Sequence, residues 1–339
     1  MSTPFTRAYT FDDVGLVPQF NNVPSRTAPV LKTWVTKKTE IDIPILASNM
    51  ESVIGDELAD LLIERGSIPI FHRFTPFERQ VEWVKKYGNK TYISCGILNL
   101  DGVKQLLELG ARGVCIDVAH GHNDLMLNFI RKIKESFPET EVIAGNICTP
   151  MAYHDLVSAG ADAVKVGIGP GAACTTRRIT GFGVPQFTAI YQCAHVASRL
   201  RVPLIADGGI RDSRDIVLAL AAGANTVMLG KLFSLTRESA AEKRISKNNS
   251  ALTEAKYRGQ ASADFQNEFY GGLKGKTVAE GVDFWAAITG SANDLIDQLL
   301  GGLRSGLTYG GARSIKELQR KAEFVEVTLN YIKESLPRP

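Results

Sequence analysis

The chain has 339 residues, of which 44% are hydrophobic and 22% charged, and its formal net charge at pH 7 is +3. This is the composition of an ordinary globular protein, which excludes collagen-like and disordered classes. The small charge and scattered basic residues give no reason to expect a nucleic-acid partner. No apolar run approaches the ~18 residues of a membrane span, and the N-terminal residues lack a signal-peptide layout, so we expect a cytoplasmic protein without a membrane partner.

Eight short runs rich in Ile, Val, Leu and Ala predict strands. They are apolar throughout, as strands buried on both faces are, and most are separated by amphipathic segments such as 125–136. Parallel strands joined by helices form a closed (β/α)8 barrel or an open doubly wound sheet, and eight units favour the barrel without requiring it. The length fits one barrel with insertions or two domains. The expected strands are 43–47, 68–71, 91–96, 113–117, 141–145, 163–167, 202–207 and 226–229.

Polar residues and glycines follow many of these runs, where the C-terminal ends of parallel strands would meet on one rim. A functional site is expected there. Two longer insertions interrupt the rhythm, one after Gly167 and one at about 234–283. We expect the second to be a mobile segment over the site, the alternative being a solvated surface loop. The residues at the rim are Ser48, Asn49, His72, Arg73, Asp117, His120, Gly145, Asn146, Gly167, 207–209 and Gly230.

The sharpest motif is KVGIGPGAACTTRRITGFGVPQ at 165–186. Glycines at 167, 169 and 171 free the backbone to approach a ligand or ion. They precede Cys174, which is flanked by two threonines and by Arg177 and Arg178, a setting that could lower a thiol pKa and hold an anion. Cys174 is therefore the candidate nucleophile, although a cysteine can also be a small buried hydrophobe. The other four lie in or beside apolar runs, and no CxxC spacing indicates zinc or a disulfide framework.

A second motif, Asp207-Gly208-Gly209 with Gly230 after the next run, predicts a phosphate cradle, because barrels often bind phosphate after strands seven and eight. The Asp207 carboxylate could accept hydrogen bonds from two ribose hydroxyls. The two adjacent glycines could instead form only a tight turn.

These motifs resemble the inosine monophosphate dehydrogenase and guanosine monophosphate reductase family over nearly the whole chain. The resemblance implies a single (β/α)8-barrel domain over 1–339, a homotetramer and a purine nucleoside monophosphate substrate. The chain has no counterpart of the regulatory domain that is inserted in many dehydrogenases. The resemblance rests on FDDV at 11–14, ASNM at 47–50, DVAHGH at 117–122, GPGAACTTR at 169–177, GVPQ at 183–186, ADGGI at 206–210, YRG at 257–259 and GGLRSGLTY at 301–309.

The resemblance also implies roles for individual residues. Cys174 would attack purine C2, Thr176 would lie beside the leaving group or water, and Glu280 would meet the purine N1 edge. The remaining roles fall to three groups. They are the substrate-binding Ser48, Asp207, Gly208, Gly209, Gly230, Tyr257 and Gly259, the cofactor-binding Asp117, Ala119 and His120, and the carbonyls of Gly167, Gly169 and Cys174 for potassium.

Two positions depart from the family pattern. Ala172 stands where a serine commonly helps to hold phosphate, and Gln260 stands where a methionine usually lies near the base. The identity of the base is therefore open.

The family has two reactions, and the sequence favours the reductase, which converts GMP to IMP and ammonia with NADPH. The 262–280 connection is short and lacks the Arg-Tyr pair of dehydrogenase flaps. Against this, the stretches 183–186 and 202–207 look more like dehydrogenases. An NAD-dependent IMP dehydrogenase without the regulatory domain, a related purine-ring oxidoreductase or a catalytically silent nucleotide-binding relative are the alternatives.

Overall fold

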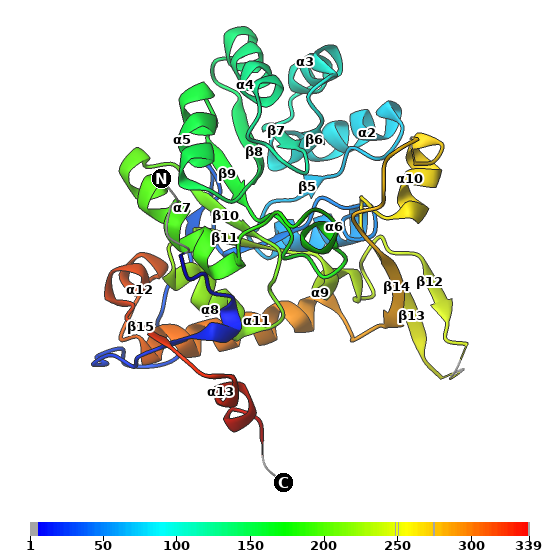
Figure 1. Cartoon of the computed structure of the whole chain (residues 1–339). Coiled ribbons are helices and arrows are strands. Elements are labelled where there is room, and N and C mark those ends of the chain that lie inside the picture. The colour runs from blue at the N-terminus through cyan, green and yellow to red at the C-terminus, as the bar shows by residue number, and fades with distance from the viewer. Residues whose placement is uncertain (1–5, 248, 250, 274, 338–339) are drawn as a thin grey trace.

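The computed structural model describes residues 6–247, 249, 251–273 and 275–337, and its centre is an eight-stranded parallel sheet curled into a barrel (Figure 1). The strand order is β4-β11-β10-β9-β8-β7-β6-β5, and the seam between β4 and β5 is bridged where the Ser67 hydroxyl donates to the Ile45 carbonyl at 2.6 Å. The expected (β/α)8 barrel is confirmed and the open sheet was wrong. The strands are β4 (Ile45–Ala47), β5 (Ile70–Phe71), β6 (Tyr92–Cys95), β7 (Gly113–Asp117), β8 (Glu141–Ile147), β9 (Ala163–Val166), β10 (Leu204–Asp207) and β11 (Thr226–Leu229).

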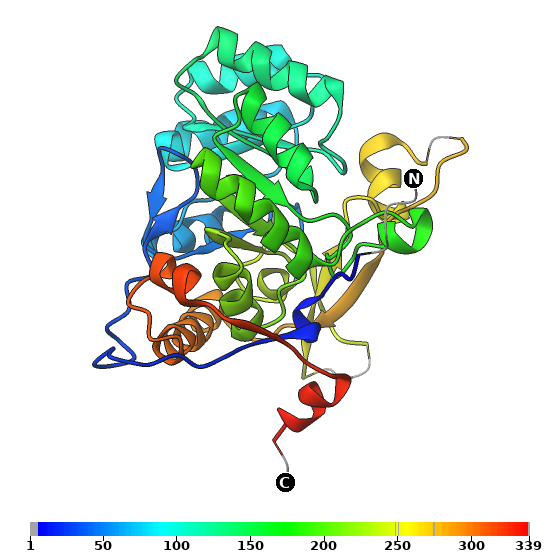
Figure 2. The ribbon, with the colours of Figure 1, turned by 60° about the vertical axis from the view of Figure 1, so that its left-hand side comes forward.

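A ring of helices follows these strands and covers the outside of the barrel (Figures 1 and 2). Several begin at side-chain caps, such as Asn123, whose side chain accepts from the N–H of Met126. Among the described residues, no helix is long and apolar enough to cross a membrane. The ring consists of α1 (Asp56–Glu64), α2 (Phe77–Tyr87), α3 (Leu100–Glu108), α4 (Asp124–Ser136), α5 (Pro150–Ala159), α7 (Gln186–Leu200), α8 (Ser213–Ala221) and α11 (Ala292–Tyr309).

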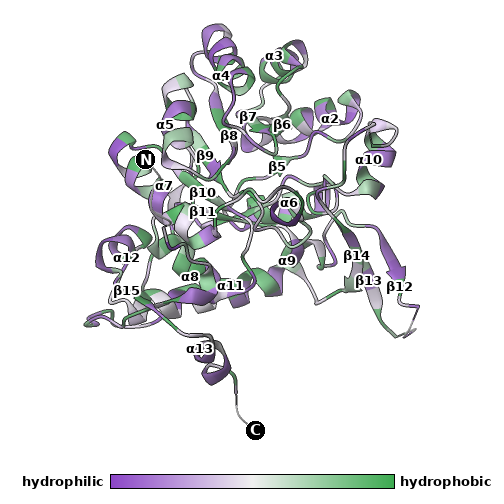
Figure 3. Ribbon diagram, viewed as in Figure 1, coloured by the Kyte–Doolittle hydropathy of each residue, from purple (hydrophilic) through white to green (hydrophobic). Residues whose placement is uncertain are grey.

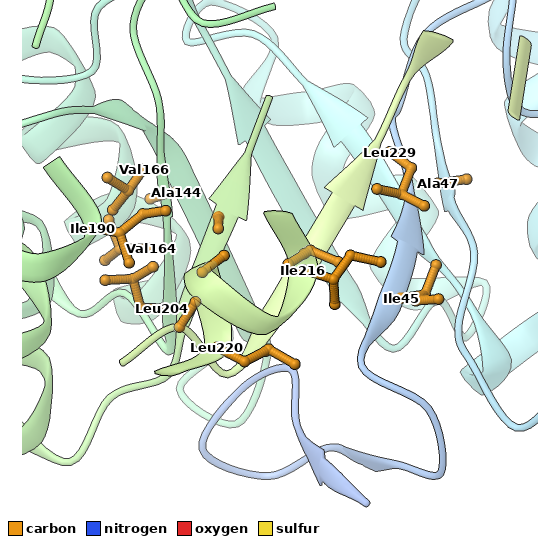
Figure 4. Packing of buried hydrophobic residues seen from close by; sticks show 14 of the residues in the cluster. Ile45, Ala47, Ala144, Val164, Val166, Ile190, Leu204, Ile216, Leu220 and Leu229 are labelled. Carbon is orange, nitrogen blue, oxygen red and sulfur yellow. The ribbon is translucent and has the colours of Figure 1, made fainter. Parts of the chain in front are cut away.

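Alternation along each strand sorts its side chains into two apolar layers. One face packs outward against the helices, as Val164, Leu204 and Leu229 do in Figure 4. The other fills the barrel interior, and the colouring in Figure 3 shows the hydrophobic centre against polar outer helix faces. Each strand contributes one residue to this inner layer: Leu46, Ile70, Tyr92, Cys115, Ile143, Ala163, Ile205 and Met228.

The 234–283 segment, expected to be a mobile loop, contains regular structure. Strands β12 (Lys243–Ile245) and β13 (Thr253–Arg258) form an antiparallel sheet with β14 (Asp283–Ala287), which begins at the last residue of the segment, and α10 (Ala263–Tyr270) lies between β13 and β14 in sequence. Positions 248, 250 and 274 of the segment lie outside the described residues. Its mobility stays a prediction.

Short elements complete the chain. Near the two termini, β1 (Val14–Leu16) pairs with β15 (Phe324–Glu326), so the ends of the chain are joined. The others are η1 (Phe11–Asp13), β2 (Thr33–Trp34), β3 (Glu40–Ile41), η2 (Gly88–Lys90), α6 (Thr176–Thr180), α9 (Lys231–Ser234), α12 (Ile315–Lys321) and α13 (Leu329–Glu334).

Candidate active site

Cys174 lies on the loop that leaves β9, at the C-terminal rim of the barrel. Its Sγ donates to Oγ1 of Thr176 at 3.2 Å, and its backbone N–H donates to the Gly171 carbonyl at 3.0 Å. A partly exposed thiol beside a hydroxyl is accessible for chemistry. Burial raises the pKa of the other four thiols and disfavours their reactive thiolates: Cys95, Cys115, Cys148 and Cys193.

Arg177 holds this loop in shape. Gly169 has φ +86°, and a Cβ there would lie 2.5 Å from Cγ of Arg177, so the loop closes tightly around the arginine stem. The guanidinium donates to the carbonyls of Ile168 and Val184. The sequence suggested that Arg177 and Arg178 flank the thiol to hold an anion. The structure instead uses Arg177 to brace the loop backbone and leaves Arg178 exposed.

The 207–209 turn packs against the cysteine loop. Both glycines have positive φ, and a Cβ on Gly208 would lie 3.0 Å from the Pro170 ring. The side-chain amide of Gln186 donates to the Asp207 carbonyl at 3.2 Å, which ties the end of β10 to the start of α7. The predicted ribose-binding turn and the loop of the nucleophile are therefore neighbours on one rim.

Three of the expected substrate-binding residues converge at the end of β11. A Cβ on Gly230 would lie 2.5 Å from the Tyr257 hydroxyl and 3.3 Å from Oγ of Ser48. Burial raises the pKa of Tyr257, and the negative charge of Asp207 raises it further. The phenol is therefore a neutral hydrogen-bond donor, which donates to Sδ of Met50 at 3.6 Å, and only a glycine at 230 lets it lie this close to the chain.

The long segment reaches the nucleophile through backbone pairing. The N–H of Thr175 donates to the Glu280 carbonyl at 2.9 Å, and the N–H of Val282 donates to the Ala173 carbonyl at 2.9 Å. Gly259 follows in the same array, because its N–H donates to the Val282 carbonyl at 3.0 Å. Among the described residues none hydrogen-bonds to the Glu280 carboxylate, which leaves it available to a ligand. Glu280 and Gly259 are thus brought beside the cysteine loop.

Known proteins match this arrangement of strands, loops and site. A family model described as "IMP dehydrogenase / GMP reductase domain" matches residues 8–338. The chain belongs to this family. The inosine-5'-monophosphate dehydrogenase of Borreliella burgdorferi is 35% identical over 393 residues, covering 97% of this chain and 96% of that protein. The enzyme of the same name from Cryptosporidium parvum is 34% identical over 384 residues, covering 97% and 94%.

Membership makes the chain a purine nucleotide oxidoreductase of this family, which uses a nicotinamide cofactor. The relatives are named dehydrogenases, which favours the alternative reaction over the reductase that the sequence favoured. The Aquifex aeolicus dehydrogenase is 46% identical over 249 residues, but the match covers only 50% of that protein. The alignment with the Borreliella enzyme spans 393 residues and this chain has 339, so at least 54 aligned positions have no counterpart here.

Of the residues expected to meet the cofactor, Asp117 ends β7, and Ala119 and His120 lie exposed on the following loop. The group that holds Asp117 was not predicted from the sequence. Lys165, in the middle of β9, donates to it at 2.8 Å. A charged residue inside the apolar run 163–167 was the available signal, because a buried lysine almost always has a charged partner.

The two departures and the predicted potassium site can be placed as well. The Gln260 amide donates to the Asn49 carbonyl at 3.0 Å, so it braces the loop after β4, while Ala172 is exposed. The Gly167 carbonyl already accepts from the Asn146 amide at 2.8 Å, although a carbonyl has a second lone pair for a cation. Potassium binding stays a prediction.

Proposed function

We propose that this protein acts at C2 of a purine nucleoside 5'-monophosphate through a covalent bond to Sγ of Cys174. The observation that carries the proposal is the 3.2 Å contact between Cys174 and Thr176 at the C-terminal rim of the barrel. The thiolate adds to C2, and the Thr176 hydroxyl lies where a group leaving C2, or a water attacking it, would pass.

The substrate would be held at two points on either side of the thiol. The backbone N–H groups of Gly209 and Gly230 and the Tyr257 hydroxyl can donate to the phosphate oxygens. The Asp207 carboxylate can accept from the ribose hydroxyls. Fixing the phosphate and the ribose would bring C2 of the base into reach of Cys174.

We favour reductive deamination of GMP to IMP as the reaction, because the segment whose backbone pairs with the loop of the nucleophile carries a carboxylate there, that of Glu280. Glu280 can pass a proton, together with Thr176, to the amino group that leaves C2 as ammonia. The nicotinamide cofactor, expected to be NADPH, supplies the hydride that takes the place of sulfur at C2. The protein's part is to hold the thioimidate dry and oriented until then.

The state of the nearest arginine supports this choice. Hydrolysis needs a base, and residues 262–280 contain no arginine. Arg258 lies just before them, but it is bound by the carboxylates of Glu51, Asp264 and Glu268. Burial lowers the pKa of Arg258, but the hydrogen bonds to Glu51 and Glu268 raise it by more. This guanidinium therefore stays protonated and cannot act as a base.

Oxidation of IMP with NAD is the second candidate, and the names of the relatives support it. It shares the thioimidate, which water would then hydrolyse to XMP. The stretches 183–186 and 202–207, which look like dehydrogenase sequences, agree with it. The base that activates the water would have to come from a residue other than Arg258.

Two assays with the purified protein distinguish the candidates. In the first, GMP is incubated with NADPH, and both the loss of NADPH absorbance and the release of ammonia are measured. In the second, IMP is incubated with NAD, and the increase in NADH absorbance is measured. We expect one IMP and one ammonia for each NADPH consumed. NADH formation from IMP with no ammonia from GMP would assign the dehydrogenase instead. Activity in neither assay, with a Cys174 that resists alkylation, would indicate a catalytically silent relative.

A further inference from the structure

Lys165 is a buried charge at the centre of the barrel mouth. Its side chain is 2% exposed, and it lies between valines in β9. Burying an unpaired ammonium is costly, so its partners must compensate for the lost hydration. Those partners identify what the lysine does.

Strand parity directs Lys165 toward the barrel axis, one step above the apolar inner layer. It shares a face of β9 with Ala163, just as Asp117 shares a face of β7 with Cys115 and Asp207 shares one of β10 with Ile205. Between β7 and β9, the residue of β8 in register is Gly145. The register thus sets Asp117, Gly145 and Lys165 side by side, while on β10 Lys165 is in register with Ile205 and reaches Asp207 two residues further along the strand.

Gly145 opens the path across β8. A Cβ at this position would lie 2.6 Å from Cβ of Lys165, so any larger residue would push the lysine aside. With glycine there, the ammonium lies 2.8 Å from Oδ1 of Asp117 and 3.0 Å from Oδ2 of Asp207. It also donates to Oδ1 of Asn49 at 3.3 Å. An ammonium has three protons, and three acceptors surround it.

The other oxygen of each carboxylate is left without a partner in the described part of the chain. Oδ2 of Asp207 accepts from Lys165 and from the Asn146 amide at 2.9 Å, whereas Oδ1 has no protein donor there. Asp117 likewise bonds Lys165 through Oδ1 only. The two aspartate side chains keep 15% and 16% of their surface exposed, so their free oxygens can meet ligands.

We propose that Lys165 is a positioning residue that fixes Asp117 and Asp207 with one ammonium and thereby couples nucleotide binding to cofactor binding. The inference rests on the proposed function, in which Asp207 holds the nucleotide ribose and Asp117 faces the cofactor. A hydrogen bond from either ligand to its aspartate weakens the hydrogen bond between that aspartate and the ammonium. The hydrogen bond of the ammonium to the other aspartate then strengthens, so the two sites are linked through these contacts without a movement of the chain.

Calorimetric titration of GMP and of IMP into the full-length protein tests whether Lys165 positions Asp207 for the nucleotide. Lys165→Met keeps the bulk and removes the charge, and we expect it to weaken nucleotide binding by about tenfold or more, as the loss of a charged hydrogen bond does. The matched control is Lys134→Met. Lys134 lies on the outer helix α4 and also bonds a buried aspartate, Asp162. This variant should leave nucleotide affinity unchanged. Affinity of Lys165→Met within twofold of wild type would overturn the inference.

A second measurement separates positioning from a structural role. In Lys165→Ala, added ethylammonium should restore nucleotide affinity, whereas ethanol at the same concentration should not. If neither lysine variant folds by circular dichroism, Asp117→Asn takes their place. It should change the nucleotide dissociation constant at least threefold with no cofactor present, although Asp117 does not face the nucleotide, and an unchanged constant overturns the inference. Wild-type protein that binds neither nucleotide would overturn the proposed function and this inference with it.

Discussion

The barrel and the 234–283 segment are held together by different forces. Barrel strands are buried on both faces, between an inner apolar layer and the helix-facing layer. The segment has a small apolar cluster of its own around Leu235, Ala241 and Ala255, and α10 docks on the barrel through rings and ion pairs. Phe265 of α10 packs against Phe74 with ring centroids 4.6 Å apart.

This difference separates the two halves of the proposed chemistry. Cys174 and Asp207 belong to barrel loops, whereas Glu280 arrives on the segment that has fewer buried contacts. Regions with few buried contacts open more readily than cores, and closing segments of this kind often control access to active sites. The barrel should therefore govern stability and binding, and the segment should govern the rate.

The largest effect is expected at the nucleophile. Cys174→Ala should reduce turnover to background, because no other described thiol lies at this loop, and leave nucleotide affinity largely intact, because the sulfur bonds only the reacting C2. Steady-state kinetics and calorimetry on the same sample measure both. Substantial remaining activity would contradict covalent catalysis, and lost binding would mean that the barrel loop had collapsed.

Glu280→Gln tests the proton transfer that is assigned to the 234–283 segment. Glutamine can hydrogen-bond the purine but cannot deliver a proton, so deamination of GMP should slow by about 10² to 10⁴. The melting temperature should not change, because this side chain has no partner among the described residues. Ammonia release from GMP and NADH formation from IMP are both measured. Oxidation of IMP that survives the substitution would support the dehydrogenase.

Two isoleucines compare the stability of the regions directly. Ile205 lies in the inner barrel layer with no exposed surface, and Ile205→Ala should cost about 2–5 kcal/mol of unfolding free energy by leaving a cavity. Ile245, on β12 of the segment, is 68% exposed, and its change to alanine should stay within about 0.5 kcal/mol. Denaturant unfolding gives both values. Equal losses would refute the contrast.

The sequence predicted the barrel well because its strands are determined by local pattern. The runs 113–117 and 226–229 match β7 and β11 at both ends, and β8 only extends two residues further, to Ile147. Strands β12 and β13 were missed because their residues are mostly polar, so no apolar run marks them, and β14 was missed although four of its five residues are apolar.

The site was predictable where a motif is local and less so where contacts are distant. The cysteine loop and the 207–209 turn could be read from glycines and their neighbours. The bonds from Arg177 to loop carbonyls and from Lys165 to two aspartates depend on how strands align, which single-chain spacing does not reveal.

The smallest effect on the whole protein is expected at the ion pairs that dock α10, where a substitution should change only the local stability of this helix. Arg258 on β13 bonds Asp264 and Glu268 of α10 and also Glu51 beside the barrel, so it joins the segment to the barrel. Arg258→Met should let α10 open, seen as amide hydrogen exchange on α10 faster by about tenfold or more, the change that a loss of ~1.4 kcal/mol of local stability produces.

The matched control is Arg244→Met at the far edge of the same sheet. Arg244 also pairs with a carboxylate, Glu254, and lies over a ring, that of Trp285, but it does not touch α10. Exchange on α10 should therefore stay at the wild-type rate in this variant, and the barrel strands should stay protected in both. If both variants accelerate α10 exchange equally, the segment opens as one unit and Arg258 is not what docks it. If neither does, the ring contacts of Phe265 hold α10 by themselves.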